Sequence, residues 1–570
     1  MTSDSPDRSR LLGRLIDRRS FLHHLGVGGA LSLSAAAIPL VQACGSPSGS
    51  TGGRTGKGKR GGVITEAALA DMHTFNSVLL SDVYSIAASS MIYDPLYMTD
   101  PKGTIVPCLA AAMPQVSNGG RTYTVKMRKD AKWTDGTPVT ADDVKMTYDF
   151  VVAPEYAAVN SPSRTTFSQY MQSVTIVDKY TLAFTSKTVY APFMAQFMGL
   201  GIMPKSVYGA LAADAINTAP ANTKPTITNG AFKDAVWTQG EQTTFKANTD
   251  YYRGAPLIDE YVLKPVANST NVINLLLSGE ADIGQLDNSQ YGAAKANSKL
   301  NVSIVKKSEF VYAVLQLDPT KSRLFLDKRV RQALYWAMDR EAIVHSIYFG
   351  YAEVANGPIA PAMADWFDAD IKPEYSHNQA KAEQLLDEAG FKKGPDGIRA
   401  NGDLKLSWEV LVPDTDEVEI QLATAIQNYW KKIGVDIQIK PADLDLVIVP
   451  ALDNNYNFTM IILGESVGPD PDTSVFWQTR SATTGHGNSG DYSNSQVDKL
   501  LEEGVTTLSQ GKRKEIYNQI TGDLLTDPPA LFLVYPEATL CVSKRVLGYS
   551  TSQAVSRQYY INKLETTDGK

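Results

Sequence analysis

Two kinds of hydrophobic periodicity alternate along this chain and restrict it to a mixed α/β fold. Residues 379–389 place apolar side chains on one helical face, with Gly390 as the terminator, and residues 422–433 repeat that pattern. Residues 435–439 then alternate apolar and polar side chains, as a strand with one buried face does. No repeat period and no coiled-coil heptad accompanies the alternation, so we predict layered helices and sheets rather than a solenoid or a coiled coil.

Local signals elsewhere predict further elements of the same two kinds. They come from period-two alternation, from capping residues and from the short polar turns between apolar runs. The elements are a strand beginning at residue 63, a half-buried strand at 122–128, a helix opened by a capping box at 140–143, a hairpin at 174–185 and a long helix from Asp327 toward Phe349, ended by Gly350.

The first 62 residues have the composition of a targeting signal followed by a flexible tether. Arg18 and Arg19, followed by Ser-Phe-Leu, resemble a twin-arginine export signal, and residues 25–43 are uncharged and only weakly apolar. The residues just before Cys44 resemble a lipobox, in which that cysteine is lipidated; an ordinary cleaved signal or an uncleaved anchor is the alternative. Residues 45–62 are nearly all Gly, Ser, Thr, Lys and Arg and predict a flexible tether.

The sequence offers no motif for catalysis, metal binding or nucleic-acid binding. No histidine pair has metal-ligand spacing, and there is no Cys-x-x-Cys, no Gly-x-Ser-x-Gly and no phosphate-binding loop ending in Gly-Lys-Ser or Gly-Lys-Thr. We therefore expect no metal and no cofactor. A net charge of −7, without a long basic stretch in the folded part, argues against a nucleic-acid partner.

Two cysteines, Cys108 and Cys541, lie outside the targeting region. They could pair in an oxidising compartment, but the sequence cannot show that they meet. We expect them to remain unpaired.

Ten short segments of this chain match motifs that recur in the same order in other proteins. The most diagnostic are residues 121–124, 132–138, which read Lys-Trp-Thr-Asp-Gly-Thr-Pro, and 141–144. The others lie at 93–96, 105–110, 229–232, 248–254, 327–343, 381–390 and 433–435. Together, over about residues 60–545, they resemble the family 5 extracellular solute-binding proteins of peptide, opine and nickel ABC importers.

That resemblance implies an α/β fold of the Venus-flytrap type, similar to periplasmic binding proteins, with three domains of which the first is discontinuous. It places the ligand between domains I and III, which close about a hinge. On this basis we divide the chain into a signal peptide (1–43), a tether (44–62), domain I (63–100, 225–315 and 535–570), domain II (101–224) and domain III (316–534).

One departure from the family pattern bears on the ligand. Many peptide-binding relatives carry an Asp-Tyr pair just before the segment that corresponds to residues 469–472, and that Asp holds the α-amine of the peptide. Here the two positions are Val467 and Gly468, so the amine anchor is missing unless Glu465 or Asp470 replaces it. If neither carboxylate faces the cleft, a neutral or anionic solute such as an oligosaccharide becomes the better match.

Aromatic and polar residues near the expected cleft are the candidates for ligand contacts, because solute pockets combine stacking area with orienting hydrogen bonds. The candidates are Phe75 and Asn76 on the first lobe, and Trp366, Phe367, Glu465, Asp470, Trp477, His486 and Tyr492 on domain III.

The function implied by the resemblance is that of the extracytoplasmic solute-binding component of an ABC importer. Such a protein captures an oligopeptide or a related small solute by hinge closure and delivers it to a membrane permease and its ATPase. We expect a monomer that a lipid anchor holds at the cell membrane, without enzymatic activity. The alternative is a cell-surface enzyme or a non-transport lipoprotein.

Overall fold

The computed structural model describes residues 58–371, 375–452, 456–479, 487–552 and 555–570. The predicted signal peptide with Arg18 and Arg19, the lipidation site Cys44 and the candidate His486 lie outside the described residues. The folded part begins at Lys59, whose backbone N–H donates to the carbonyl oxygen of Thr566 at 2.8 Å. Residues 59–62 therefore belong to the folded body, although we expected them in the tether.

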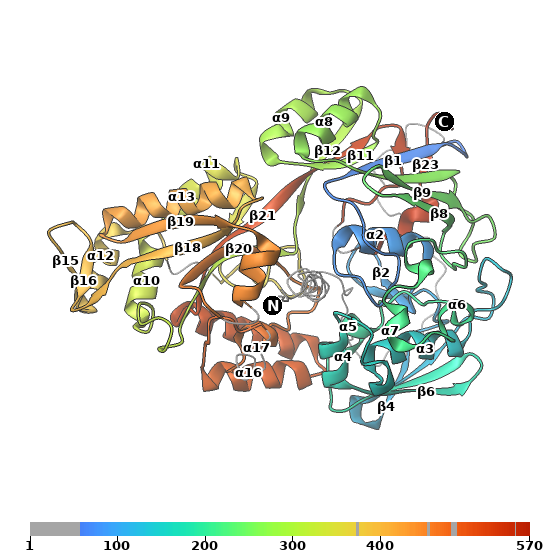
Figure 1. The fold of residues 1–570 in the computed structure, drawn as a ribbon, viewed down its shortest axis with the longest axis horizontal. Helices are drawn as coiled ribbons and strands as arrows, with labels where there is room; N and C mark the ends of the chain where they lie inside the picture. Colours follow the sequence, from blue (N-terminus) through green and yellow to red (C-terminus); the bar gives the residue numbers. More distant parts are fainter. Residues whose placement is uncertain (1–57, 372–374, 453–455, 480–486, 553–554) are drawn as a thin grey trace, which may run out of the picture.

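A twelve-stranded mixed sheet runs through the molecule (Figure 1). Its strand order is β19-β18-β20-β13-β21-β11-β1-β10-β9-β8, and β12 and β14 also pair with β21. The strands are β1 Val63–Ala68, β8 Phe232–Thr238, β9 Gln242–Ala247, β10 Glu260–Pro265, β11 Ile283–Leu286, β12 Leu300–Lys306, β13 Glu309–Leu315, β14 Ala352–Val354, β18 Ser407–Pro413, β19 Asp436–Ala442, β20 Met460–Ser466 and β21 Ala530–Ser543.

Strand β21 joins the two halves of this sheet. Residues 530–534 of β21 pair with β13, whereas residues 537–543 pair with β12 and β11. The chain crosses a second time between β12 and β13, at residues 307–308. These two crossings connect a first lobe (58–306 and 538–570) with a second lobe (309–535), an arrangement that permits hinge motion.

Strand β13 lies in the second lobe, although we drew the end of domain I after it, at residue 315. It is hydrogen-bonded to β20 on one side and to the first part of β21 on the other. Val311, Ala313 and Leu315 pack in a second-lobe hydrophobic cluster. The chain therefore leaves the first lobe at residues 307–308, and the other domain boundaries stay predictions.

The first lobe adds a four-stranded antiparallel sheet in the order β4-β5-β7-β6. The predicted strand at 122–128 and the hairpin at 174–185 are confirmed in it. Helix α3 begins at the predicted capping box, where the backbone N–H of Thr140 donates to Asp143 Oδ2 at 2.8 Å. The elements are α2 Val83–Ile92, β4 Gln115–Ser117, β5 Thr122–Lys126, α3 Ala141–Val152, α4 Arg164–Tyr170, β6 Met171–Asp178, β7 Thr181–Ser186, α5 Phe193–Phe197, α8 Ser269–Ser278 and α9 Tyr291–Ala296.

The helices of the second lobe pack around its half of the large sheet. They are α10 Lys328–Ala337, α11 Arg340–Ile347, α12 Gln379–Glu388, α13 Glu417–Lys432, α16 Ser495–Thr506 and α17 Gln510–Thr526. The predicted helices at 379–389 and 422–433 are confirmed. The single helix predicted from Asp327 to Phe349 is wrong, because Met338 is extended and Asp339 caps a second helix by accepting from the N–H of Ala342 at 2.9 Å.

The two cysteines of the folded part are unpaired, as expected. Cys108 and Cys541 are both free and have no exposed surface. Burial raises the pKa of Cys541 to about 11 and that of Cys108 further, so neither thiol is disposed to react.

Candidate functional site

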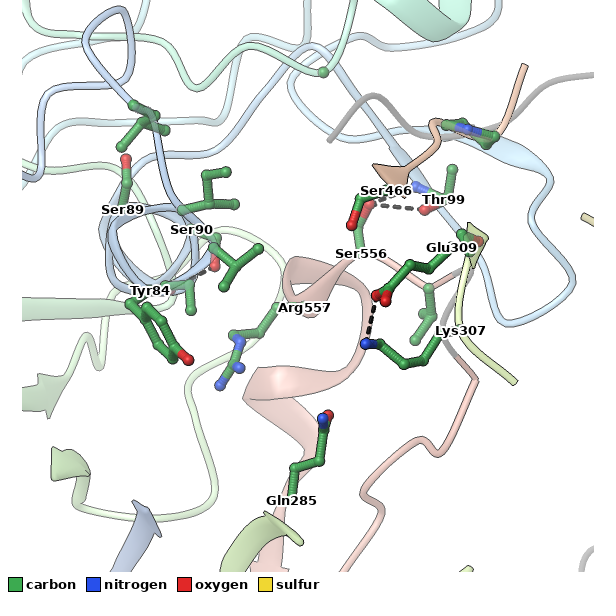
Figure 2. A pocket seen from close by; sticks show the side chains of 18 of the residues that line it. Tyr84, Ser89, Ser90, Thr99, Gln285, Lys307, Glu309, Ser466, Ser556 and Arg557 are labelled. Carbon is green, nitrogen blue, oxygen red and sulfur yellow. Dashed lines mark hydrogen bonds and ion pairs between the residues drawn. The ribbon is translucent and has the colours of Figure 1, made fainter. Parts of the chain in front are cut away.

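An interlobe cavity of about 950 Å³ lies between the two lobes, beside the crossing from β12 to β13. Both lobes line it, and Figure 2 shows Tyr84, Ser90 and Arg557 of the first lobe and Lys307 and Glu309 at the crossing around the same space. The lining comes from the end of β1, helix α2 and residues 549–560 of the first lobe, and from residues 307–309, 362–366, 413–419 and 463–469 of the second.

The first-lobe wall is rich in neutral hydroxyl groups. Ser81, Tyr84, Ser89 and Ser90, on and just before helix α2, line the cavity. The helix begins where the carboxylate of Asp82 accepts from two backbone N–H groups of the first turn, at 2.8 and 3.0 Å. Ser89 and Ser90 donate to the carbonyl oxygens of Phe75 and Ala87. The hydroxyls of Ser81 and Tyr84 can both donate to and accept from the amide groups of a ligand.

A partly buried ion pair stands in the same wall. Arg557 Nη1 lies 2.6 Å from Glu66 Oε2, and the hydroxyl of Tyr261 donates to the same carboxylate. Burial acts to raise the pKa of Glu66, but the charge and hydrogen bonds of Arg557 outweigh burial and hold that pKa below its ordinary value. The pair is therefore charged but neutralised internally, and it adds no net charge to the cavity.

The second-lobe wall carries four ionisable side chains at the hinge, Lys307, Glu309, Asp416 and Glu419, which we call the acidic corner. Lys307 is paired with Glu309. Asp416 caps helix α13 and accepts from two backbone N–H groups at 3.0 Å. A Cβ placed on Gly464 would lie 2.9 Å from Glu309 Oε1 and 3.2 Å from Glu419 Oε1, so these two carboxylates converge on one point of the wall.

The charges of the acidic corner do not balance. Burial, followed by the charges of Asp416 and Glu309, raises the pKa of Glu419 well above its ordinary value and favours its protonated form. Burial acts to lower the pKa of Lys307, but Glu309 outweighs burial and raises it. The corner therefore sets the carboxylates of Glu309 and Asp416 against one lysine, and its formal charge is negative.

Val467 lines the cavity at the position where the family pattern places an amine anchor. Neither of the two candidate replacements for the anchor, Glu465 and Asp470, lines the cavity. Glu465 is 1% exposed, on strand β20, and lies within the electrostatic reach of Tyr312. Asp470 is held by Arg513 in the interior of the second lobe, with N–O distances of 2.7 and 2.8 Å. The wall is therefore apolar at position 467, and the acidic corner lies elsewhere on the same second-lobe wall.

The other predicted ligand residues are distributed over several environments. Trp366 lines the cavity. Phe367 is partly buried and packs against the cluster of buried apolar side chains that includes Trp366. Phe75 and Asn76 have no exposed surface, and Asn76 Nδ2 donates to Asn222 Oδ1 at 2.9 Å in the interior of the first lobe. The structure thus brings Trp366 to the cavity and places Phe75 and Asn76 in a core.

Trp477 and Tyr492 line a second, much smaller cavity of about 20 Å³. That volume is close to what a single water molecule needs. Their roles in ligand binding, like that of Phe367, stay predictions.

Sequence reasoning missed the residues that give the cavity its charge. Asp416 could have been found, because it stands three residues before Glu419 at the start of the predicted helix at 422–433, which is a capping position. No sequence signal marks Lys307, Glu309 and Arg557. They line the cavity because the crossing between the lobes lies beside it and because the C-terminal segment returns to the first lobe.

The two lobes also touch at what we call the distal contact. The hydroxyl of Tyr190 donates to Asp472 Oδ2 at 3.3 Å, and the backbone N–H of Ala191 donates to the carbonyl oxygen of Val505 at 2.7 Å. Figure 1 shows helices α4 and α5 of the first lobe beside α16 and α17 of the second at this place. The lobes are therefore in contact both at the hinge and at this second place.

The model of the family described as bacterial extracellular solute-binding proteins, family 5 Middle, matches residues 104–487. The chain belongs to this family. Oligopeptide-binding protein AppA of Bacillus subtilis is 28% identical to it over 497 residues, which are 87% of this chain and 90% of that protein. Protein XP55 of Streptomyces lividans is 30% identical over 472 residues, 82% of this chain and 83% of that one.

Solved structures of the family confirm the Venus-flytrap fold that the sequence patterns led us to expect. The structure of AppA from Bacillus subtilis in complex with a nonapeptide matches with a TM-score of 0.77 at 27% identity, over 90% of this chain and all of that one. NikZ from Campylobacter jejuni in complex with Ni(L-His) matches with a TM-score of 0.74 at 25% identity, over 88% of this chain and 99% of that one.

Among the described residues, no three or more His, Cys, Asp and Glu side chains are grouped as metal ligands would be. No helix in this part of the chain combines the length and the apolar character needed to cross a membrane.

Proposed function

We propose that this solute-binding protein is the extracytoplasmic peptide-binding component of an ABC importer. The observation that carries the proposal is the interlobe cavity, because two lobes joined by two strand segments enclose about 950 Å³ that both of them line. A concave, preformed space of this kind between two lobes is where a protein of this class holds its solute.

A peptide suits the lining of the cavity. Its main chain offers one N–H donor and one carbonyl acceptor per residue without charge, and the hydroxyl groups of helix α2 can pair with both. Trp366 and Val467 add apolar surface for side chains. The relative named for oligopeptide binding and the neighbour solved with a nonapeptide support the same class of solute.

Closure about the hinge would couple binding to delivery. A ligand that contacts both lobes favours the closed form by the difference between its affinities for the two forms. The distal contact adds two hydrogen bonds to that form, and an ordinary hydrogen bond contributes only about 0.5–1.5 kcal/mol. The ligand would therefore supply most of the free energy of closure, and the permease would recognise the closed protein.

We extend the proposal to the location of the protein. Export through the twin-arginine route and lipidation of Cys44 at the outer face of the cell membrane are supported by Arg18, Arg19 and the lipobox pattern. We further propose that the protein acts there as a monomer. A tether of Gly, Ser and Thr before the folded body would let the lobes reach a permease and its ATPase.

Three measurements test the function. Native mass spectrometry of protein purified from its source should find a bound peptide, and calorimetry with a random pool of tri- to nonapeptides should show saturable binding of one peptide per chain. Chromatography of the pool after incubation should recover every peptide intact, since we propose binding without turnover. Cleaved peptides would identify an enzyme, and binding of oligosaccharides with no binding of the pool would overturn the peptide proposal.

A further inference from the structure

The distal contact depends on two short segments of the second lobe. In one, the carboxylate of Asp472 accepts from the hydroxyl of Tyr190. In the other, the carbonyl oxygen of Val505, on helix α16, accepts from the N–H of Ala191, and the side chain of Val505 packs among apolar side chains of the first lobe. Each segment supplies one acceptor to the first lobe, so both must be held in place for the two bonds to form together.

The guanidinium of Arg513, on helix α17, ties these two segments to each other. Its Nε donates to the carbonyl oxygen of Gly504, the residue before Val505, at 2.8 Å. Its two terminal nitrogens donate to the carboxylate of Asp470, whose Oδ1 also accepts from the backbone N–H of Asp472 at 3.0 Å. A guanidinium is planar and presents its donors in a rigid fork. Arg513 therefore fixes the position of one segment relative to the other.

The same guanidinium lies directly behind the wall of the cavity. Its Cζ is 4.9 Å from the ring centroid of Trp366, which lines the cavity, and 5.4 Å from that of Tyr517. The two rings meet edge to face, at an interplanar angle of 79°. A cation over the face of an aromatic ring is attracted to it. A ligand that restrains the ring of Trp366 therefore also restrains the group that holds the two segments.

Close packing allows this restraint to pass between the helices. A Cβ on Gly504 would lie 2.9 Å from both Cζ and Oη of Tyr517, so α16 and α17 are in direct contact where Arg513 binds them. Elements packed this closely shift as units, because they have no room to deform by small amounts. A displacement of Arg513 would therefore reach the acceptor of Val505.

We infer that Arg513 is a positioning residue for the closure of the two lobes, which sets the acceptors of the distal contact and links them to the cavity wall at Trp366. The inference rests on the proposed function and adds the residue through which ligand binding acts on the contact between the lobes. A ligand that holds Trp366 stabilises the fork, and the fork presents Asp472 and Val505 to the first lobe. Because coupling between two sites is reciprocal, the distal contact in turn strengthens ligand binding.

A double-mutant cycle on peptide affinity tests the inference. Tyr190→Phe removes one bond of the distal contact and should weaken binding of a peptide about two- to tenfold. Arg513→Lys keeps the positive charge but lacks the fork, so it cannot hold both segments. In the Arg513→Lys protein, Tyr190→Phe should therefore leave the affinity unchanged, since the bond that it removes is no longer formed.

Arg399→Lys provides the matched control background. Arg399 begins strand β16 (Arg399–Asn401) at the outer end of the second lobe, away from α16 and α17 (Figure 1). Like Arg513 it is buried, and it donates through Nε to a backbone carbonyl oxygen and through Nη1 to a carboxylate, that of Asp387. Tyr190→Phe should keep its full effect on peptide affinity in the Arg399→Lys protein.

Amide hydrogen exchange at Ala191 reports on the distal contact directly, with or without a peptide, because this N–H bonds across the lobes to Val505. The exchange should be faster in Arg513→Lys than in the wild type or in Arg399→Lys, and saturating peptide should slow it only in the latter two. If Arg513→Lys does not fold, Trp366→Leu takes its place. It removes the ring in front of the guanidinium and should reduce the slowing that saturating peptide produces at Ala191.

The outcomes separate the two proposals. An effect of Tyr190→Phe that is as large in Arg513→Lys as in the wild type would overturn the positioning role and leave peptide binding standing. Loss of that effect in Arg399→Lys as well would show a general loosening of the second lobe and would also overturn it, as would full slowing at Ala191 in Trp366→Leu. If no peptide binds, the proposed function fails, and the exchange of Ala191 in the ligand-free proteins still decides whether Arg513 positions the distal contact.

Discussion

Asp470 and Arg513 face each other in a buried, two-pronged ion pair. Oδ1 lies 2.7 Å from Nη2 and Oδ2 lies 2.8 Å from Nη1, and the side chains are only 3% and 4% exposed. The guanidinium also lies over the ring of Trp366, with Cζ 4.9 Å from the ring centroid. The pair therefore supports a side chain of the cavity wall from behind.

Asp470→Asn should lower the free energy of unfolding by about 3–5 kcal/mol, because it leaves the buried guanidinium of Arg513 without its counter-charge. Urea unfolding measures the effect. Asp142→Asn is the matched control, since it breaks a half-exposed pair with Lys205, and it should change the stability by about 0.5 kcal/mol or less. Loss of peptide affinity with unchanged stability would instead assign Asp470 to the ligand.

The distal contact should bias the protein toward its closed form. Tyr190→Phe removes the hydroxyl that bonds to Asp472, and we expect peptide affinity to fall about two- to tenfold, the range of an ordinary hydrogen bond. Small-angle scattering should show that saturating peptide reduces the radius of gyration of the wild-type protein.

Tyr180→Phe, in the turn between β6 and β7 of the same lobe, is the control for the distal contact and should bind peptide as the wild type does. A radius that does not change with ligand would argue against hinge closure, even if binding itself is observed.

Local signals in the sequence were sufficient for most elements of the fold. The capping box at Thr140 and the helix-ending Gly390 act through neighbouring residues, so their structural meaning can be read locally. Asp339 shows the limit of such reading. The pattern around it suits the interior of a long helix, yet its carboxylate bonds to the following turn and begins a new helix.

The site could be predicted less well, for two physical reasons. Large aromatic side chains suit ligand stacking and core packing equally, and Phe75 is used in a core. The charged residues of the cavity, such as Lys307, Asp416 and Arg557, come from distant parts of the chain and meet only through the folding of both lobes. No local sequence pattern indicates that residues so far apart in the chain will line one cavity.

The membrane anchor has a direct test. Cys44→Ala should prevent lipidation and move the protein from the membrane fraction to the soluble fraction. Replacing both Arg18 and Arg19 with lysine should block export, since the export receptor reads the arginine pair. Cell fractionation with immunoblotting measures both effects. A Cys44→Ala protein that stays with the membrane would show that residues 25–43 act as the anchor.

The acidic corner should make stability depend on pH through Glu419. Burial and the charges of Asp416 and Glu309 raise its pKa in the folded protein well above 4.5, against the backbone hydrogen bond of Gly464 and the charge of Lys307. The Tyr348 hydroxyl lies within electrostatic reach of the same carboxylate. Between 4.5 and the raised pKa, the folded state therefore binds more protons than the unfolded state. Linkage then requires the free energy of unfolding to fall as the pH rises through this window.

Glu419→Gln removes this titration while keeping a polar side chain of the same size. The stability of the variant relative to the wild type should therefore increase as the pH rises from 5, until the pKa of Glu419 in the folded protein is passed, because only the wild type loses a bound proton from this site. Urea unfolding of both proteins across that range measures the difference, in which the titration of other buried acids such as Asp472 cancels. Glu353→Gln, at an exposed pair with Lys306, should show a difference that stays constant with pH. A constant difference for Glu419→Gln as well would mean that Glu419 is already ionised in the folded protein, and the corner would then hold one more negative charge than we assign to it.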